Sequence, residues 1–139
     1  EVCGIDLVKW QIRIAARMPL AFRQEDIRAL GCAMECRINA RSTGTVDFLH
    51  APGGTKVRFD TALVTGTPVV PYYDALLGKL IVWAPDREEA IRKMEAALCE
   101  LLIQGVETNR EELLTIIRSP RFQSGEYDTC FLEGGGAGE

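Results

Sequence analysis

GCAMECRIN, residues 31–39, alternates apolar and polar side chains along its whole length. A period of two is typical of a strand with one buried face and one open face. The two faces of this strand carry, respectively, Cys32, Met34, Cys36 and Ile38, and Ala33, Glu35, Arg37 and Asn39. The second face aligns a carboxylate, a guanidinium and an amide. It is either a solvated surface with a local charge pair or a row of functional groups.

The segments on either side of this strand also follow regular patterns. Apolar residues at helical spacing predict a helix over residues 4–18 that ends before Pro19. The turn residues Pro52-Gly53-Gly54 lie between two strand-like runs, which predicts a hairpin. An alternating pattern at residues 56–60 and strand-like runs at 45–51 and 78–84 predict three further strands.

Two helices are predicted in the C-terminal half. The first begins with a capping-box-like pair at Asp86 and runs to Gly105, and the second is capped by Thr108-Asn109 and ends at Ser119-Pro120. Two prolines predict an extended loop over residues 67–71. Because strands and helices do not alternate regularly, we expect an α+β fold with a mostly antiparallel sheet and helices packed on one side.

Composition narrows the class of protein. The chain has 139 residues, a net charge of −4 and 47% hydrophobic residues. This length predicts one domain with a real core, and the hydrophobic fraction excludes wholesale disorder. The acidic balance argues against sequence-blind nucleic-acid binding, and no apolar run is long enough for a membrane span.

The thiols and the lone histidine predict a reducing compartment and no metal site. Five cysteines at irregular spacing, without a signal segment, indicate reduced thiols in a cytoplasmic protein. Cys32 and Cys36 are interpreted as buried apolar residues, because His50 is the one histidine and two thiols alone make a poor zinc site. No phosphate-binding glycine motif is present, so the chain is either a small domain that binds no nucleotide or part of a larger protein.

Several motifs, in order, resemble the C-terminal domain of biotin carboxylase. They are E-C-R-I-N-A at 35–40, H-A-P-G-G at 50–54 with V-R at 57–58, and Y-Y-D at 72–74 with G-K-L at 78–80. The resemblance extends over nearly the whole chain. It implies a helix leading out of an ATP-grasp domain (residues 1–18), the C-terminal domain itself (19–133) and a flexible glycine-rich tail (134–139).

The family implies an ATP-dependent ligase reaction. Biotin carboxylases use ATP and Mg²⁺ to activate bicarbonate and carboxylate biotin on a carrier protein. The resemblance thus implies several partners for the chain: an ATP-grasp domain, the biotin carboxyl carrier protein and, as a homodimer, a second copy. Nucleic acid and membranes are not expected as partners. We expect the isolated chain to be inactive and to hold no cofactor or metal by itself.

The family also implies roles for individual residues. Arg37 matches a catalytic arginine that stabilises negative charge on biotin. Asp74 matches an acidic residue that orients this arginine, although capping a turn is an equally open role. Arg58 matches a dimer contact, or is a solvated strand residue. Thr129 and Cys130 occupy nucleotide-proximal positions, but Cys130 replaces the family's histidine.

Three interpretations of function remain open. The first is an acetyl-CoA carboxylase type of enzyme, as in fatty acid synthesis. The second is a non-catalytic module for dimerisation or docking. The third is the same domain from a propionyl-CoA, pyruvate or urea carboxylase. One departure from the family pattern affects all three: a loop with E-D-P and P-S-P-G is missing after Ala40, where Arg41-Ser42-Thr43 leads directly into Gly44.

Overall fold

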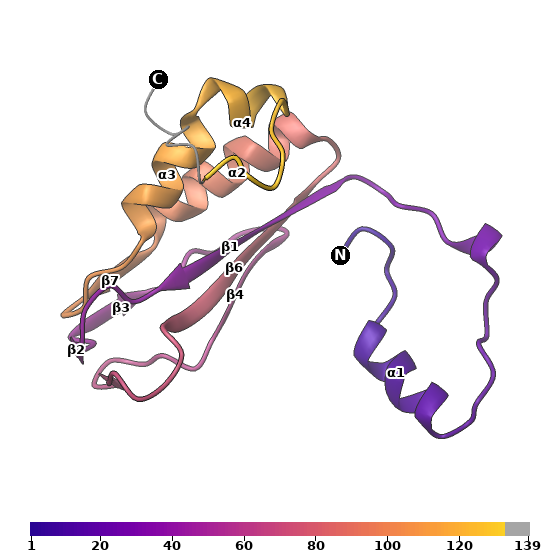
Figure 1. Ribbon diagram of the computed structural model, residues 1–139, viewed down its shortest axis with the longest axis horizontal. Coiled ribbons are helices and arrows are strands. Elements are labelled where there is room, and N and C mark those ends of the chain that lie inside the picture. The colour runs from indigo at the N-terminus through magenta and orange to yellow at the C-terminus, as the bar shows by residue number, and fades with distance from the viewer. Residues whose placement is uncertain (133–139) are drawn as a thin grey trace.

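A three-stranded antiparallel sheet forms the centre of the molecule. The computed structural model describes residues 1–132. Its main sheet has the order β1-β6-β4 (Figure 1). The strands are β1 (Cys32–Asn39), β6 (Leu76–Ala84) and β4 (Val57–Thr61). β1 runs beside β6 from the pair Cys32 and Ala84 to the pair Asn39 and Leu76.

The predicted alternation of β1 is confirmed. Cys36 and Ile38 are buried, whereas Glu35 and Arg37, which alternate with them along the strand, are exposed. On the neighbouring strand, Leu80 and Val82 are buried on the same side of the sheet. One side of the sheet therefore faces the core and the other faces outward.

Three helices lie on the inner side of this sheet: the first two contact its strands, and the last packs against the second (Figure 1). They are α2 (Arg87–Glu100), α3 (Arg110–Arg118) and α4 (Pro120–Ser124). Helix α2 begins at Asp86, whose side chain accepts a hydrogen bond from the Glu89 amide at 2.8 Å, as expected for an N-cap. Buried side chains from the sheet and the helices form the core: Cys36, Ile38, Leu77, Leu80, Val82, Ile91, Met94, Ala97, Leu98, Leu101, Leu114 and Ile117. The predicted α+β fold, with helices on one side, is confirmed.

The N-terminal helix lies apart from this core. Helix α1 (Leu7–Ala15) falls within the predicted range and is followed by a single 3-10 turn, η1 (Gln24–Asp26). None of the α1 residues is buried. The contacts of Trp10 are local, with an edge-to-face packing against Phe22. The apolar face of α1 is therefore open in this chain (Figure 1).

The predicted hairpin around Pro52-Gly53-Gly54 is wrong. Residues 45–51 do not form one strand, because the chain changes partners at Val46, which is fully buried. On either side of Val46 lie two short strands that pair with distant segments. They are β2 (Gly44–Thr45), which pairs with β5 (Pro68–Val69), and β3 (Phe48–His50), which pairs with β7 (Leu102–Gln104). Long-range pairing thus replaces the local turn.

Three further boundaries differ from the predictions. The extended loop over residues 67–71 contains β5, a two-residue strand. Helix α2 ends at Glu100, because β7 follows before Gly105, which has a φ of 89° in the turn after β7. Helix α3 ends before Ser119 as predicted, but α4 follows directly, with the Ser119 hydroxyl accepting a hydrogen bond from the Phe122 amide at 3.3 Å.

No helix within residues 1–132 is both long and apolar enough to span a bilayer.

Candidate functional site

The outward side of the main sheet, which we call the open face, carries two rows of side chains. In the first row, Lys79 lies between Arg37 and Asp60, its in-register partners on β1 and β4. In the second row, Glu35 and Arg58 flank Ile81 in the same way. The polar face predicted for residues 31–39 therefore continues across all three strands. Its charged members are Glu35, Arg37, Arg58, Asp60 and Lys79.

Arg37 is the exposed cation at the β1 end of the first row. Its guanidinium makes no hydrogen bond or ion pair with any other residue in the range 1–132. The side chain beside it, Lys79, is also cationic, so the local charge favours an anionic group at this position. Five donors of the guanidinium are thus available for an external acceptor.

The backbone of Arg37 is held by Asn109, which precedes α3. The Asn109 amide nitrogen Nδ2 donates to the Arg37 carbonyl at 3.1 Å, and Oδ1 accepts from the Asn39 amide at 2.8 Å. The Asn109 main-chain amide also donates to the Asn39 carbonyl at 3.1 Å. The sequence predicted Asn109 as a helix cap, but its side chain makes no capping hydrogen bond. The residue type and its position before a helix are the same whether the asparagine caps the helix or binds a distant strand, so the sequence could not distinguish these roles.

Asp74 caps a turn in the loop before β6. Its Oδ1 accepts a hydrogen bond from the Leu76 amide at 3.1 Å. It forms no ion pair with Arg37, so the structure shows the turn-capping role of this carboxylate. Together with Ala40, Arg41 and others, Asp74 lines a cavity of about 240 Å³. This cavity lies at the site of the short loop after Ala40.

Arg58 lies on the open face in a small charge network. It forms ion pairs with Glu1 and, at 2.8 Å, with Asp60. The hydrogen bond from Arg58 to Asp60, together with the charges of Asp60 and Glu1, raises the pKa of the guanidinium. Because Arg58 is exposed, it is available to a partner on this face.

Thr129 and Cys130 belong to the helical side of the molecule. The Cys130 amide donates to the Asp128 carboxylate at 3.0 Å, and both Thr129 and Cys130 are exposed. The neighbouring Phe131 is buried against Tyr127, which in turn stacks on Phe122 of α4. The structure therefore does not bring Thr129 and Cys130 together with Arg37.

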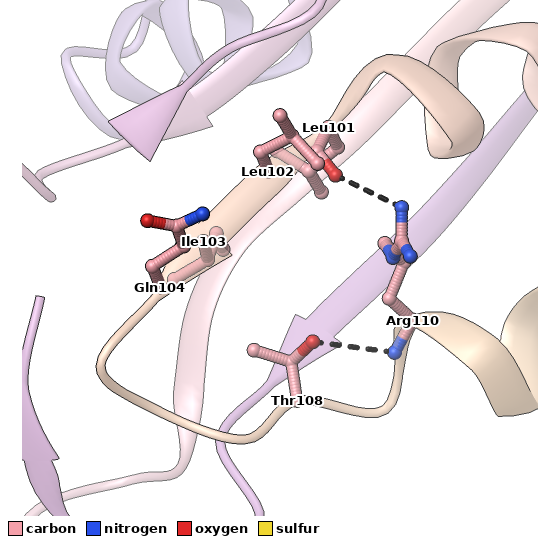
Figure 2. A pocket seen from close by; sticks show the side chains of 6 residues that line it. All are labelled: Leu101, Leu102, Ile103, Gln104, Thr108 and Arg110. Carbon is pink, nitrogen blue, oxygen red and sulfur yellow. Dashed lines mark hydrogen bonds between the residues drawn. The ribbon is translucent and has the colours of Figure 1, made fainter. Parts of the chain in front are cut away.

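A second cavity, of about 90 Å³, lies between β7 and the start of α3 (Figure 2). Arg110 extends beside it and donates hydrogen bonds to the carbonyls of Leu98 and Leu101 at 3.3 and 3.2 Å. These carbonyls belong to the end of α2, where cationic side chains stabilise exposed carbonyl groups. The Thr108 hydroxyl accepts from the Arg110 amide. The side chains of Arg110 and Thr108 thus make hydrogen bonds at the end of α2 and the start of α3.

The buried thiol of β1 has no catalytic features. Burial, with a smaller contribution from the charge of Glu35, raises the pKa of Cys36 to about 12. A thiol held in this protonated form is a poor nucleophile and a poor metal ligand. Within residues 1–132, no group of three or more histidine, cysteine or acidic side chains is arranged to hold a metal ion.

Comparison with known proteins now defines the class. The family model described as "Biotin carboxylase C-terminal domain" matches residues 35–134, a range that includes most of the main sheet, the charged residues of the open face and all three covering helices. The chain belongs to this family. The part of β1 that carries Arg37 lies at the start of the matched region.

Individual relatives agree with the family. The chain is 45% identical to the biotin carboxylase of Haemophilus influenzae over 139 residues, which cover 95% of this chain and 31% of the relative. It is 44% identical to the 2-oxoglutarate carboxylase small subunit of Hydrogenobacter thermophilus, again over 95% of this chain and 30% of the relative. The chain therefore spans about a third of the length of these relatives.

Solved structures give the same fold. The crystal structure of the biotin carboxylase subunit of pyruvate carboxylase matches with a TM-score of 0.90 and 43% identity, covering 96% of this chain and 31% of that one. The biotin carboxylase domain dimer of Hydrogenobacter thermophilus 2-oxoglutarate carboxylase, in complex with MgADP, ADP and bicarbonate, matches with the same TM-score, identity and coverage.

Proposed function

We propose that this chain forms one wall of a biotin carboxylase active site, with Arg37 as the catalytic residue it supplies. The observation that carries this proposal is the position of Arg37. Its guanidinium is exposed on the open face, has no protein partner within residues 1–132 and lies on a strand that pairs with β6 along one edge and is held by Asn109 at the other. The family membership of residues 35–134 supports the reaction class.

The chemistry of the proposed role follows from charge. The ureido group of biotin is a weak nucleophile, and removal of its proton places negative charge on the ureido oxygen. A guanidinium aimed at that oxygen stabilises the charge as it develops. Arginine suits this task because it stays cationic and presents a rigid fork of donors. The in-register Lys79 strengthens the positive field around Arg37.

The residues present fit biotin better than the nucleotide. Arg37 offers the donors that a ureido oxygen needs, whereas residues 1–132 contain no carboxylate cluster suited to a metal ion. We therefore propose that the nucleotide and Mg²⁺ are held by the ATP-grasp domain that the family implies. ATP would supply the activation of bicarbonate there, and the residues of this chain would bind and orient biotin.

Three further roles are proposed for the remaining site residues. Asp74 lies at the cavity beside Ala40, and we propose that its carboxylate orients Arg37 in the assembled enzyme. Arg58, exposed on the open face, is proposed to contact a second copy of the chain. Thr129 and Cys130, on the helical side, are proposed to lie near the nucleotide, and of these Cys130 lacks the ring of the family's histidine.

The acceptor is proposed to be an acyl-CoA of the acetyl-CoA carboxylase type, in the cytoplasm. This proposal rests on the resemblance of the motifs at residues 35–40, 50–54 and 72–80. Two relatives, at 45% and 43% identity, are named biotin carboxylase, a name that specifies no acceptor. A pyruvate carboxylase chain of Methanothermobacter thermautotrophicus matches at 41%, so pyruvate and 2-oxoglutarate enzymes are the competing assignments. Comparing acetyl-CoA, propionyl-CoA, pyruvate and 2-oxoglutarate as acceptors in the intact enzyme distinguishes them.

Substitution of Arg37 tests the proposed role. In the intact protein that contains this chain, Arg37→Ala should lower kcat for biotin carboxylation by roughly 10²–10³-fold, the usual effect of removing one charge-stabilising donor. Arg37→Lys should recover only a part of the activity, because lysine keeps the charge but loses the fork. Wild-type turnover of Arg37→Ala, measured as biotin-dependent phosphate release, would favour the docking-module interpretation.

A further inference from the structure

We infer that Asn109 is a positioning residue for Arg37, acting through the backbone of β1; this inference rests on the proposed function. Asn109 lies in the loop before α3, far from β1 in sequence. Its side-chain amide bridges two backbone groups on the edge of β1 that faces away from β6. In this geometry it replaces a neighbouring strand at the residue that carries the catalytic guanidinium.

The first argument concerns the other edge of β1. The pairing with β6 is regular from Cys32 to Ile38 and then shifts register between Ile38 and Asn39. The ladder is therefore irregular after Ile38, the residue that follows Arg37, so regular pairing stops one residue beyond the catalytic side chain. Asn109 binds the carbonyl of Arg37 and the amide of Asn39, and so spans this irregular point from the opposite edge.

The second argument concerns what the Asn109 side chain does not do. Asparagine at the position before a helix normally accepts a hydrogen bond from an amide of the first turn. Asn109 makes no such bond, and the Arg110 amide instead donates to the hydroxyl of Thr108 at 3.4 Å. The side chain of Asn109 is thus committed to β1, and its donor and acceptor are both used there.

The third argument concerns Arg37 itself. Because its guanidinium has no polar partner within residues 1–132, the backbone is what sets its starting position. A displacement of about 1 Å at a catalytic group can lower a rate by up to roughly 10²-fold. The side chain of Asn109 therefore holds the backbone at the point where a small displacement would move the Arg37 guanidinium and lower the rate of the proposed reaction.

The decisive variant is Asn109→Asp in the intact protein. Aspartate caps helices as well as asparagine does, so a capping role would survive the change. The bridge to Arg37 would not, because a carboxylate cannot donate to the Arg37 carbonyl. We expect kcat for carboxylation of free biotin to fall roughly 10-fold, with the KM for ATP unchanged and little change in Tm.

A double-mutant cycle separates positioning from a general structural effect. If Asn109 acts through Arg37, Asn109→Asp in the Arg37→Ala background should change kcat by less than about 2-fold, because the group being positioned is absent. Asp86→Ala serves as the matched control, because it removes a helix-capping side chain whose hydrogen bond goes to the Glu89 amide and not to β1. We expect the kcat of this variant to stay within about 2-fold of wild type.

The outcomes distinguish this inference from the proposed function. Wild-type kcat in Asn109→Asp, or an undiminished effect of Asn109→Asp in the Arg37→Ala background, overturns the positioning role while leaving Arg37 catalytic. Wild-type kcat in Arg37→Ala overturns the proposed function. Should Asn109→Asp not fold, Asn109→Ser replaces it, because serine also caps helices but is too short to bridge both groups.

Discussion

The covered face and the open face of the main sheet use the same strands for different purposes. On β1, Cys36 and Ile38 are buried beneath the helices, while Glu35 and Arg37 project from the other side. The side chains of the covered face pack against apolar side chains of the helices and form the core. The open face carries a guanidinium with no partner within residues 1–132, which contributes nothing to the core. Residues that stabilise the core therefore alternate along β1 with the residue that is proposed to be catalytic.

Truncation of the covered face should have the largest effect on stability. Ile38 is fully buried, so Ile38→Ala should lower the free energy of unfolding by about 2–5 kcal/mol. Glu35→Ala, on the open face of the same strand, should change it by less than about 0.5 kcal/mol. Urea denaturation of both variants measures the difference. Equal losses would mean that the two faces are not energetically distinct.

The buried thiol of Cys36 gives the covered face a pH dependence. Its pKa rises from 9.0 to about 12 on folding, so above pH 9 the unfolded chain loses this proton before the folded chain does. Stability should then fall as pH rises from about 9 to about 12, by up to about 1.4 kcal/mol per pH unit. Below pH 9 this contribution is constant.

Cys36→Ala isolates that contribution. The slope of unfolding free energy between pH 9 and pH 10.5 should be less negative in this variant than in the wild type, because other titrating groups are common to both. Parallel slopes in the two proteins would show that the Cys36 thiol is not held protonated by burial.

Only a small effect on stability is expected for Arg58 on the open face. Its ion pairs are exposed, so Arg58→Ala should lower the free energy of unfolding by less than about 1 kcal/mol. If this face also forms the proposed contact with a second copy, sedimentation of the intact protein should show weaker self-association. Unchanged self-association would leave Arg58 as a solvated strand residue.

The sequence alone predicted the structure correctly where a feature depends on a pattern of neighbouring residues. The alternation of residues 31–39 predicted both which side of β1 is buried and that Arg37 is exposed. Asp86 likewise marked the start of α2 correctly. In each case the determining pattern lies within a few residues, so no knowledge of distant segments is needed.

Distant contacts explain what the sequence did not predict. The turn at Pro52-Gly53-Gly54 suggested a hairpin, but β3 pairs with β7 instead, about fifty residues further along the chain. Asn109 has the residue type and position of a helix cap, yet its hydrogen bonds go to β1. In both cases a side chain or strand had more than one available partner, and a distant segment supplied the one that the structure uses.

The division between the two faces is tested most directly by measuring kcat and the free energy of unfolding on the same preparation of Arg37→Ala in the intact protein. We predict that kcat for biotin carboxylation falls at least about 100-fold, while the free energy of unfolding changes by less than about 0.5 kcal/mol. Unchanged turnover, or a loss of activity that merely follows a loss of stability, would contradict a catalytic arginine on the open face.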